Sequence, residues 1–72
     1  MASGIEKIKV KLGPNIRKYR KALKLTQFEL GVQADVTEDY IQALETGRST
    51  PSMNFLGRLA DALKVEPHEL LM

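Results

Sequence analysis

Residues 26–47 constrain the fold of this chain most strongly, because they carry the pattern of two short helices joined by a tight turn. Thr26 and Glu29 have the spacing of a capping box, in which the threonine hydroxyl accepts from the Glu29 amide and the glutamate carboxylate accepts from the Thr26 amide. A helix is therefore predicted to begin at Thr26. Asp35 ends it, since aspartate tolerates the left-handed backbone conformation that many helix ends need.

A second helix is predicted directly after this turn. Thr37 can cap its N-terminus, and two carboxylates in its first turn suit the positive end of the helix dipole. Ile41 and Leu44 mark its buried stripe, and Gly47 closes it. Two helices of about two turns each cannot bury a core alone, so flanking helices must pack on them.

The segment before Pro14 allows two interpretations. Within residues 5–12, Ile8, Val10 and Leu12 alternate with two lysines, as in a strand, yet the apolar residues from Ile5 onward also continue the helical spacing of those that follow. Pro14 favours a helix that begins at Gly13 or Pro14, because a proline inside a helix loses one hydrogen bond and clashes with the preceding turn. We predict that this first helix ends near Lys24 and that residues 5–12 are extended or loosely helical.

The C-terminal third is predicted to add two further helices. The first is capped by Thr50, with a proline at its first position, or by Ser52, and its apolar face consists of Met53, Leu56, Leu59, Ala60 and Leu63. Pro67 can open a short fifth helix. The sequence therefore predicts an all-α protein with a single compact five-helix domain over residues 12–72, after a mobile or loosely ordered basic arm at residues 1–11.

Composition excludes several kinds of protein. The 72 residues are 43% hydrophobic and 28% charged, which leaves room for one domain with a modest core. The chain has no cysteine, and its only histidine, His68, lacks the partners of a catalytic triad or a zinc site, so we expect no enzyme, metal or cofactor. No apolar run is long enough for a membrane span, and we expect a cytoplasmic protein.

The net charge of +2 hides an uneven distribution. Residues 1–24 hold eight Lys or Arg and one Glu, a net charge of +7, whereas residues 25–72 hold three Lys or Arg and eight Asp or Glu, a net charge of −5. A positive end suits a polyanionic partner such as nucleic acid. The alternative is that these cations simply solvate an exposed face.

A resemblance to a known family rests on the order and spacing of many positions. The segments L-T-Q-x-E-L, V-T-x-x-Y-I and L-E-x-G-R, followed by P-S-M and L-A-x-A-L-x-V, resemble the helix-turn-helix domain of Cro and the phage repressors, also called the xenobiotic-response-element family. The resemblance covers residues 12–71. It implies a lambda-repressor-like fold and a transcriptional regulator that reads an operator in the major groove of double-stranded DNA with residues 37–46.

The resemblance also implies roles for individual residues. Base edges would be read by Thr37, Glu38, Asp39, Gln42 and Ala43, of which glutamine can address adenine and threonine or alanine a thymine methyl group. DNA phosphates would be bound by Gln27, Arg48, Ser49, Thr50 and Arg17. Arg20, on the inward side of the first helix, would form a structural ion pair with Glu45, since an unpaired cation there would be costly.

Several positions depart from the family pattern. Glu38 and Asp39 stand where amide or basic residues are commoner. They can accept from cytosine N4 but are repelled by phosphates, and their other possible role is to stabilise the helix dipole. Phe28 and Phe55 stand where polar residues are usual, and each is either an exposed anchor for another chain or a core residue. Gly31 replaces a small alanine at the helix contact.

Family members commonly dimerise to bind two half-sites. In this chain the apolar C-terminal end supplies the candidate interface: Phe55, Val65, Leu70, Leu71 and Met72. We therefore expect a sequence-specific regulator, such as a phage repressor, a restriction–modification controller or an antitoxin, that acts as a homodimer without a small-molecule ligand. The alternative is a protein-interaction module whose acidic helix meets a partner protein.

Overall fold

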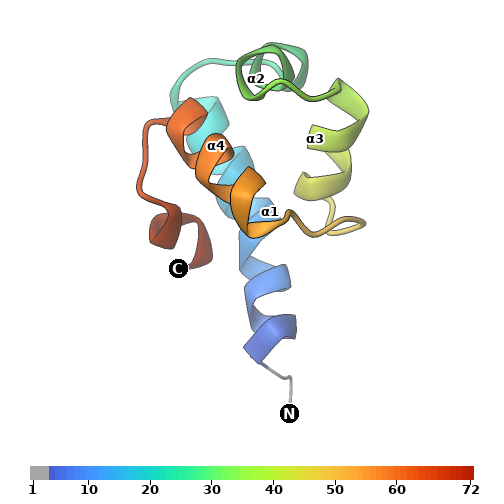
Figure 1. Ribbon diagram of the computed structural model, residues 1–72, viewed down its shortest axis with the longest axis vertical. Helices are drawn as coiled ribbons and strands as arrows, with labels where there is room; N and C mark the ends of the chain where they lie inside the picture. Colours follow the sequence, from blue (N-terminus) through green and yellow to red (C-terminus); the bar gives the residue numbers. More distant parts are fainter. Residues whose placement is uncertain (1–3) are drawn as a thin grey trace.

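Four α-helices and one 3-10 helix make up the part of the chain that the computed structural model describes, which is the backbone of residues 4–72 with side chains from Lys11 onward. They are α1 (Gly4–Ala22), α2 (Gln27–Ala34), α3 (Glu38–Glu45), α4 (Met53–Leu63) and η1 (Pro67–Leu71), arranged as in Figure 1. Residues 1–3 of the predicted N-terminal arm lie outside the described residues.

The all-α fold class is confirmed over these residues, but the predicted number of five helices is corrected to four α-helices. The element at Pro67 is present as the 3-10 helix η1, which has five residues. A segment this short satisfies few i to i+4 hydrogen bonds, and the tighter i to i+3 pattern is the usual form of such pieces.

Side-chain caps define where α2, α3 and α4 begin. The Thr26 hydroxyl accepts from the Glu29 amide at 3.0 Å, and the Glu29 carboxylate accepts from the Thr26 amide at 2.9 Å, so the predicted capping box is present. The hydrogen bond from the Thr26 amide lowers the pKa of the Glu29 carboxyl. Thr37 caps α3 as predicted, and Ser52, rather than Thr50, caps α4.

Helix α1 starts earlier than the sequence predicted. It begins at Gly4 instead of near Pro14, and it ends at Ala22, before Lys24 takes a left-handed conformation with φ 59°. Packing holds the turns around the proline, because Leu12 is buried in the core. Pro14 itself is exposed, and its local cost is the loss of one helical hydrogen bond. Residues 5–12, for which the sequence allowed a strand or a helix, are therefore helical.

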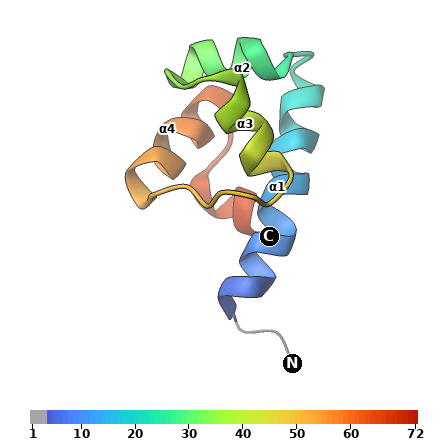
Figure 2. The ribbon, with the colours of Figure 1, turned by 90° about the vertical axis from the view of Figure 1, so that its right-hand side faces the viewer.

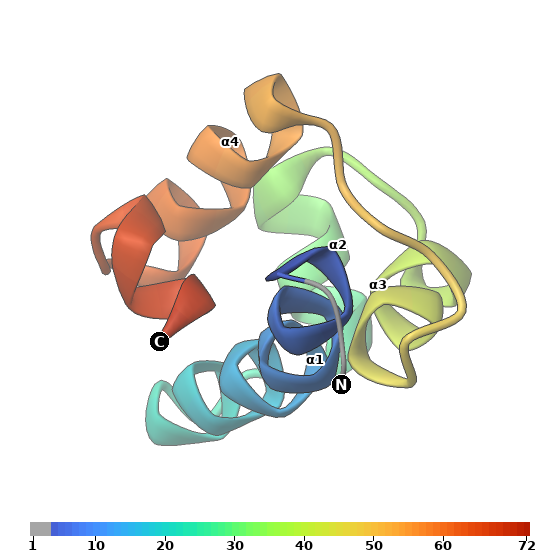
Figure 3. The same cartoon turned by 90° about the horizontal axis from the view of Figure 1, so that it is seen from below.

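The helices enclose a single core. Helix α2 packs on α3 and α4 and crosses above them in Figure 2, and α1 lies between α3 and η1 when the molecule is seen from below in Figure 3. The most deeply buried large side chains are Ile16, Leu30, Ile41, Leu44, Leu59, Leu63 and Leu70. None of the described helices combines the length and the apolar character needed to cross a lipid bilayer.

The predicted buried face of α4 is confirmed at four of its five residues, Leu56, Leu59, Ala60 and Leu63, and is wrong at Met53. Phe55 is buried and packs against Tyr40, with 5.3 Å between the ring centroids, whereas Met53 is 82% exposed. Phe55 and Leu59, four residues apart, share the buried face, and this register turns Met53 outward. Phe55 is therefore a core residue, which was one of the two interpretations of this position.

Candidate nucleic-acid interface

Helix α3 has one buried face and one exposed face. Ile41 and Leu44 are buried in the core. Among the residues predicted to read bases, Ala43 is half-buried and the other four are exposed: Thr37, Glu38, Asp39 and Gln42. The fold therefore gathers these side chains on the solvent side of one short helix.

The turn between α2 and α3 holds the two helices close together. Asp35 takes the predicted left-handed conformation, with φ 61° and ψ 46°, at the C-cap of α2. The Val36 amide then donates to the Gly31 carbonyl at 2.8 Å. A Cβ atom on Gly31 would lie only 2.7 Å from the Val36 carbonyl oxygen, so glycine allows a closer turn than alanine would.

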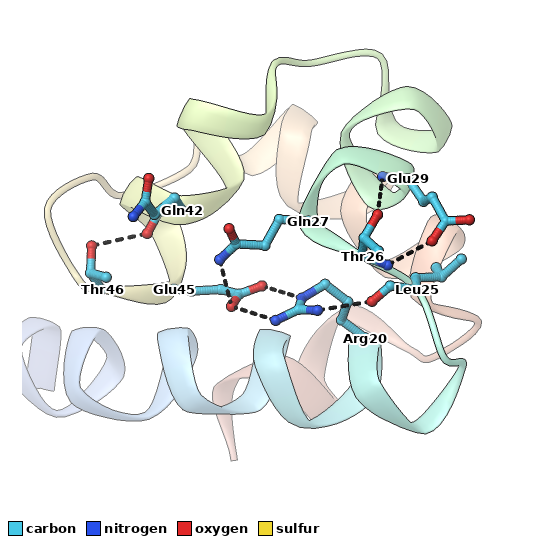
Figure 4. A network of polar contacts seen from close by, with 8 residues as sticks. All are labelled: Arg20, Leu25, Thr26, Gln27, Glu29, Gln42, Glu45 and Thr46. Atoms are coloured by element: carbon cyan, nitrogen blue, oxygen red, sulfur yellow. Dashed lines mark hydrogen bonds and ion pairs between the residues drawn. The ribbon is translucent and has the colours of Figure 1, made fainter.

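A network of polar contacts connects α1, α2 and α3, as Figure 4 shows. The predicted ion pair is present: Arg20 Nε donates to Glu45 Oε2 at 2.6 Å, and Arg20 Nη2 donates to Glu45 Oε1 at 3.1 Å. Arg20 Nη1 also donates to the Leu25 carbonyl at 2.8 Å. Only 10% and 3% of the two side chains are exposed, so this bidentate pair is a structural contact inside the fold.

Gln27 belongs to the same network. Its side-chain Nε2 donates to Glu45 Oε1 at 3.2 Å, so the side chain points toward α3 in Figure 4. The backbone amides of Gln27 and Phe28, in the first turn of α2, have no hydrogen-bond partner among the described residues. In the free protein, the backbone at this helix end is therefore open to an anion while the predicted Gln27 side chain is engaged elsewhere.

The loop after α3 folds back on the end of that helix. The amides of Arg48 and Ser49 donate to the Ala43 carbonyl at 2.8 and 3.2 Å, and Arg48 Nε donates to Thr46 Oγ1 at 3.1 Å. Arg48 and Thr50 are exposed, and Ser49 is half-buried. The Arg48 guanidinium is thus held beside the C-terminal end of α3 and keeps further N–H groups for an anionic partner.

The other charged residues of the predicted site, Glu38, Asp39 and Arg17, make fewer contacts with the rest of the described residues. Glu38 and Asp39 make no ion pair and no side-chain hydrogen bond with any residue from Lys11 to Met72. Their place in the first turn of α3 suits the helix dipole. Arg17 is exposed on α1, and no described hydrogen bond links it to α3.

Two of the predicted dimer contacts lie inside the protomer. Leu70 is fully buried and Phe55 is 7% exposed, so neither side chain can meet a second copy without opening the core. Val65 and Leu71 are half-buried and Met72 is exposed. These three residues are the part of the predicted interface that the fold leaves accessible.

A hollow beside α3 was not predicted from the sequence. Phe28 and Val32 are 61% and 65% exposed on the outer side of α2. With Val36 and the first turn of α3, they line a hollow of about 310 Å³. The four-residue spacing of Phe28 and Val32 could have indicated an apolar stripe on this side, because Leu30 and Ala34 occupy the other face of the same helix.

Two capped helices joined by a tight turn, the second with one buried and one exposed face, define a helix-turn-helix domain. Residues 16–70 match the family model described as helix-turn-helix. The chain belongs to this family, in the group of transcriptional regulators that includes Cro and the phage repressors.

Three similar proteins illustrate the relationship. An uncharacterized HTH-type transcriptional regulator of Methanothermobacter thermautotrophicus is 50% identical over 48 residues, which are 67% of this chain and 70% of that protein. The HTH-type transcriptional regulator SinR of Bacillus subtilis is 34% identical over 61 residues, which are 83% of this chain and 55% of SinR. The crystal structure of the P22 c2 repressor in complex with a synthetic operator superposes with a TM-score of 0.80 at 35% identity, over 83% of this chain and 91% of that one.

Proposed function

We propose that the protein is a sequence-specific transcriptional regulator that binds duplex DNA with α3 in the major groove. The observation that carries this proposal is the exposed face of α3, where Thr37, Gln42 and the two carboxylates between them lie on a helix whose other face is buried. The P22 c2 repressor, which is similar in sequence and fold, was solved with a synthetic operator, and this supports the same docking here.

Each exposed side chain of α3 suits a particular base. Gln42 can form two hydrogen bonds with adenine, and Thr37 or Ala43 can touch a thymine methyl group. Glu38 and Asp39 can accept from the amino group of cytosine but have no donor to offer to guanine or to a phosphate. The proposed operator half-site therefore combines cytosine with A·T base pairs.

Phosphate contacts from the start of α2 and from the loop after α3 would position the protein on the duplex. The backbone amides of Gln27 and Phe28 lie near one strand in this docking, and Arg48, with Ser49 and Thr50, lies near the other. The Gln27 side chain would reach a phosphate by exchanging its hydrogen bond with Glu45. Arg17, exposed on α1, would add a flanking contact.

A homodimer would place two copies of α3 in successive major grooves, about 34 Å apart along the duplex. Its contact would involve the accessible residues of the C-terminal end, Val65, Leu71 and Met72. An isologous contact of this kind gives the operator the same two-fold symmetry as the protein.

Selection of duplexes from a random pool tests this function. We expect enrichment of two inverted half-sites separated by one helical turn, each containing cytosine near its outer end or centre. A Gln42→Ala variant should enrich the same sites with relaxed preference at one adenine position. No enrichment at low salt, with a folded protein, would contradict DNA recognition and favour a protein-interaction module.

A further inference from the structure

Two parts of this protein lie far apart within one copy (Figure 1). The first is the hollow between α2 and α3, whose apolar wall is formed by Phe28, Val32 and Val36. The second is the beginning of α1, whose first turns project from the body of the molecule at the end opposite α2 in Figure 1. These two surfaces complement each other in polarity and in charge.

The hollow is lined by apolar side chains on the α2 side and by acidic ones on the α3 side. Phe28 and Val32 are more than half exposed, and such large apolar side chains placed side by side on a surface usually mark a contact with another molecule. The other lining residues come from the start of α3 and are Thr37, Glu38 and Asp39. No lysine or arginine lines this hollow. A suitable partner therefore presents aliphatic residues together with positive charge.

The beginning of α1 has this chemistry. Its sequence from residue 4 to residue 12, G-I-E-K-I-K-V-K-L, combines aliphatic residues with three lysines. Ile5 and Ile8 stand seven and four residues before Leu12, which is a helical spacing in the sequence. Two helical turns that extend past the core have little stability of their own, so a partner that packs on them would stabilise them.

The two surfaces cannot meet within one copy. The molecule is 36 Å long, and Figure 1 shows the first turns of α1 and helix α2 at opposite ends of its long axis. The beginning of α1, residues 4–12, carries three lysines and one glutamate, a net charge of +2, and the hollow carries the two carboxylates of Glu38 and Asp39. Contact between them therefore requires two copies, with the basic end of one facing the acidic part of the other.

We propose that a second copy of this chain places the first two turns of its α1 in the hollow beside α3. The aliphatic residues of α1 would cover Phe28 and Val32, and its lysines would lie near Glu38 and Asp39. This is a head-to-tail contact, distinct from the isologous C-terminal contact of the proposed homodimer. Because it depends on exposed charges, its strength falls as salt screens them.

This contact and the proposed DNA contact exclude each other, because both use Glu38 and Asp39. Only this consequence rests on the proposed function; the contact itself does not. Head-to-tail association would thus hold α3 away from DNA, and operator DNA would release it. At high protein concentration and low salt, the apparent affinity for DNA would therefore be lower than a single-site equilibrium predicts.

Site-specific cross-linking tests the contact, because the chain has no cysteine of its own. Full-length Gly4→Cys and Val32→Cys variants, one of them isotope-labelled, are mixed at low salt and mildly oxidised. We expect a mixed disulfide-linked dimer about tenfold more abundant than in a mixture of Gly4→Cys with Met53→Cys. Met53 is the matched control, because it is 82% exposed but does not line the hollow.

A second variant distinguishes the hollow from unspecific contact. Phe28→Ser in the Val32→Cys chain should lower the yield of mixed dimer about tenfold, whereas Met53→Ser in the same chain should leave it unchanged. A mixed product no more abundant than in the Met53→Cys control, or one that Phe28→Ser leaves unchanged, overturns the proposal. If the mixed dimer forms but added duplex DNA does not reduce it, the contact stands and its competition with DNA is wrong.

Discussion

Three side-chain hydrogen bonds converge on Glu45. Its carboxylate accepts from Arg20 and from Gln27, and Arg20 in turn donates to the Leu25 carbonyl. These contacts join α1, the connection that follows it, the start of α2, and α3. A charged pair this deeply buried contributes little when it is complete, but removal of one member leaves the other without a counter-charge.

Neutralising Glu45 should therefore destabilise the fold strongly. We expect Glu45→Gln to lower the free energy of unfolding by about 3 kcal/mol, because Arg20 loses its counter-charge while it stays buried. Urea unfolding followed by circular dichroism measures this change. Asp61→Asn, on the exposed side of α4, is the control and should change stability by less than about 0.5 kcal/mol. Equal unfolding midpoints for Glu45→Gln and the parent would show that the ion pair has no such role.

The carboxylates of α3 lead to a prediction about specificity. Glu38 and Asp39 repel phosphates wherever no amino group of a base meets them, so they should suppress non-specific binding. We expect Glu38→Gln combined with Asp39→Asn to raise the affinity for random duplex and to relax sequence preference. Fluorescence anisotropy with random and selected duplexes measures both effects.

The control for this prediction is a double variant with the same change in net charge outside α3. Asp61→Asn combined with Glu66→Gln lies outside α3 and should raise random-duplex affinity far less. Equal effects of the two double variants would mean that only net charge matters. No effect of the α3 variant would mean that this helix does not enter the groove.

At the scale of helices, the sequence predicted the helix ends correctly where each end is determined by residues a few positions apart. Thr26 and Thr37 cap their helices through contacts three residues away, and Asp35 needs only its own backbone conformation, so all three were predictable. The predicted start of α1 at Pro14 was wrong. The local cost of a proline inside the helix is offset by the packing of Leu12 in the core, which the neighbouring sequence does not show.

The site was predictable in part for the same reason. The exposed residues of α3 follow from its helical period, whereas the contact of Gln27 with Glu45 joins residues 18 positions apart and has no local signal. The burial of Phe55 on α4, where Met53 was predicted instead, involves the Tyr40 ring of a different helix. Periodicity alone does not choose between two adjacent apolar stripes on one helix.

Two glycines in helices should respond to alanine with opposite sign. At Gly13, a Cβ atom would overlap the Glu45 carbonyl oxygen and lie 2.9 Å from that of Leu44, so α1 would have to move away from α3. We expect Gly13→Ala to destabilise the protein by about 1 to 3 kcal/mol. At Gly57, a Cβ atom would meet nothing within 4 Å, so Gly57→Ala should stabilise α4 by about 0.5 to 1 kcal/mol. Thermal unfolding of both variants checks this, and a shift of the same sign in both would contradict the close contact at Gly13.

At the scale of the whole molecule, the proposed homodimer would depend on the small apolar surface at the C-terminal end. Burial of Leu70 and Phe55 within the protomer leaves Val65, Leu71 and Met72 to form the proposed isologous contact. This contact is small, so the homodimer should dissociate on dilution and should be stabilised by an operator with two half-sites.

A charge at Leu71 should separate folding from assembly. We expect Leu71→Glu to give monomers at micromolar concentration and to weaken operator binding more than it lowers the unfolding midpoint, because the new carboxylate would be buried between two copies. Sedimentation equilibrium in moderate salt, where head-to-tail contacts are screened, measures the mass. Met53→Glu is the control and should remain a dimer. A parent protein that is monomeric at high concentration, or a dimeric Leu71→Glu variant, would contradict this interface.

The central claim is that this helix-turn-helix domain binds duplex DNA, and the salt dependence of its affinity for random duplex tests that claim most directly. For the parent, we expect log K to fall steeply and linearly with log salt concentration, because phosphate contacts release counterions. Arg48→Ala should weaken all sequences about equally and reduce the magnitude of the slope by about one. No measurable binding of the folded parent at low salt, or a slope that Arg48→Ala leaves unchanged, would contradict the account.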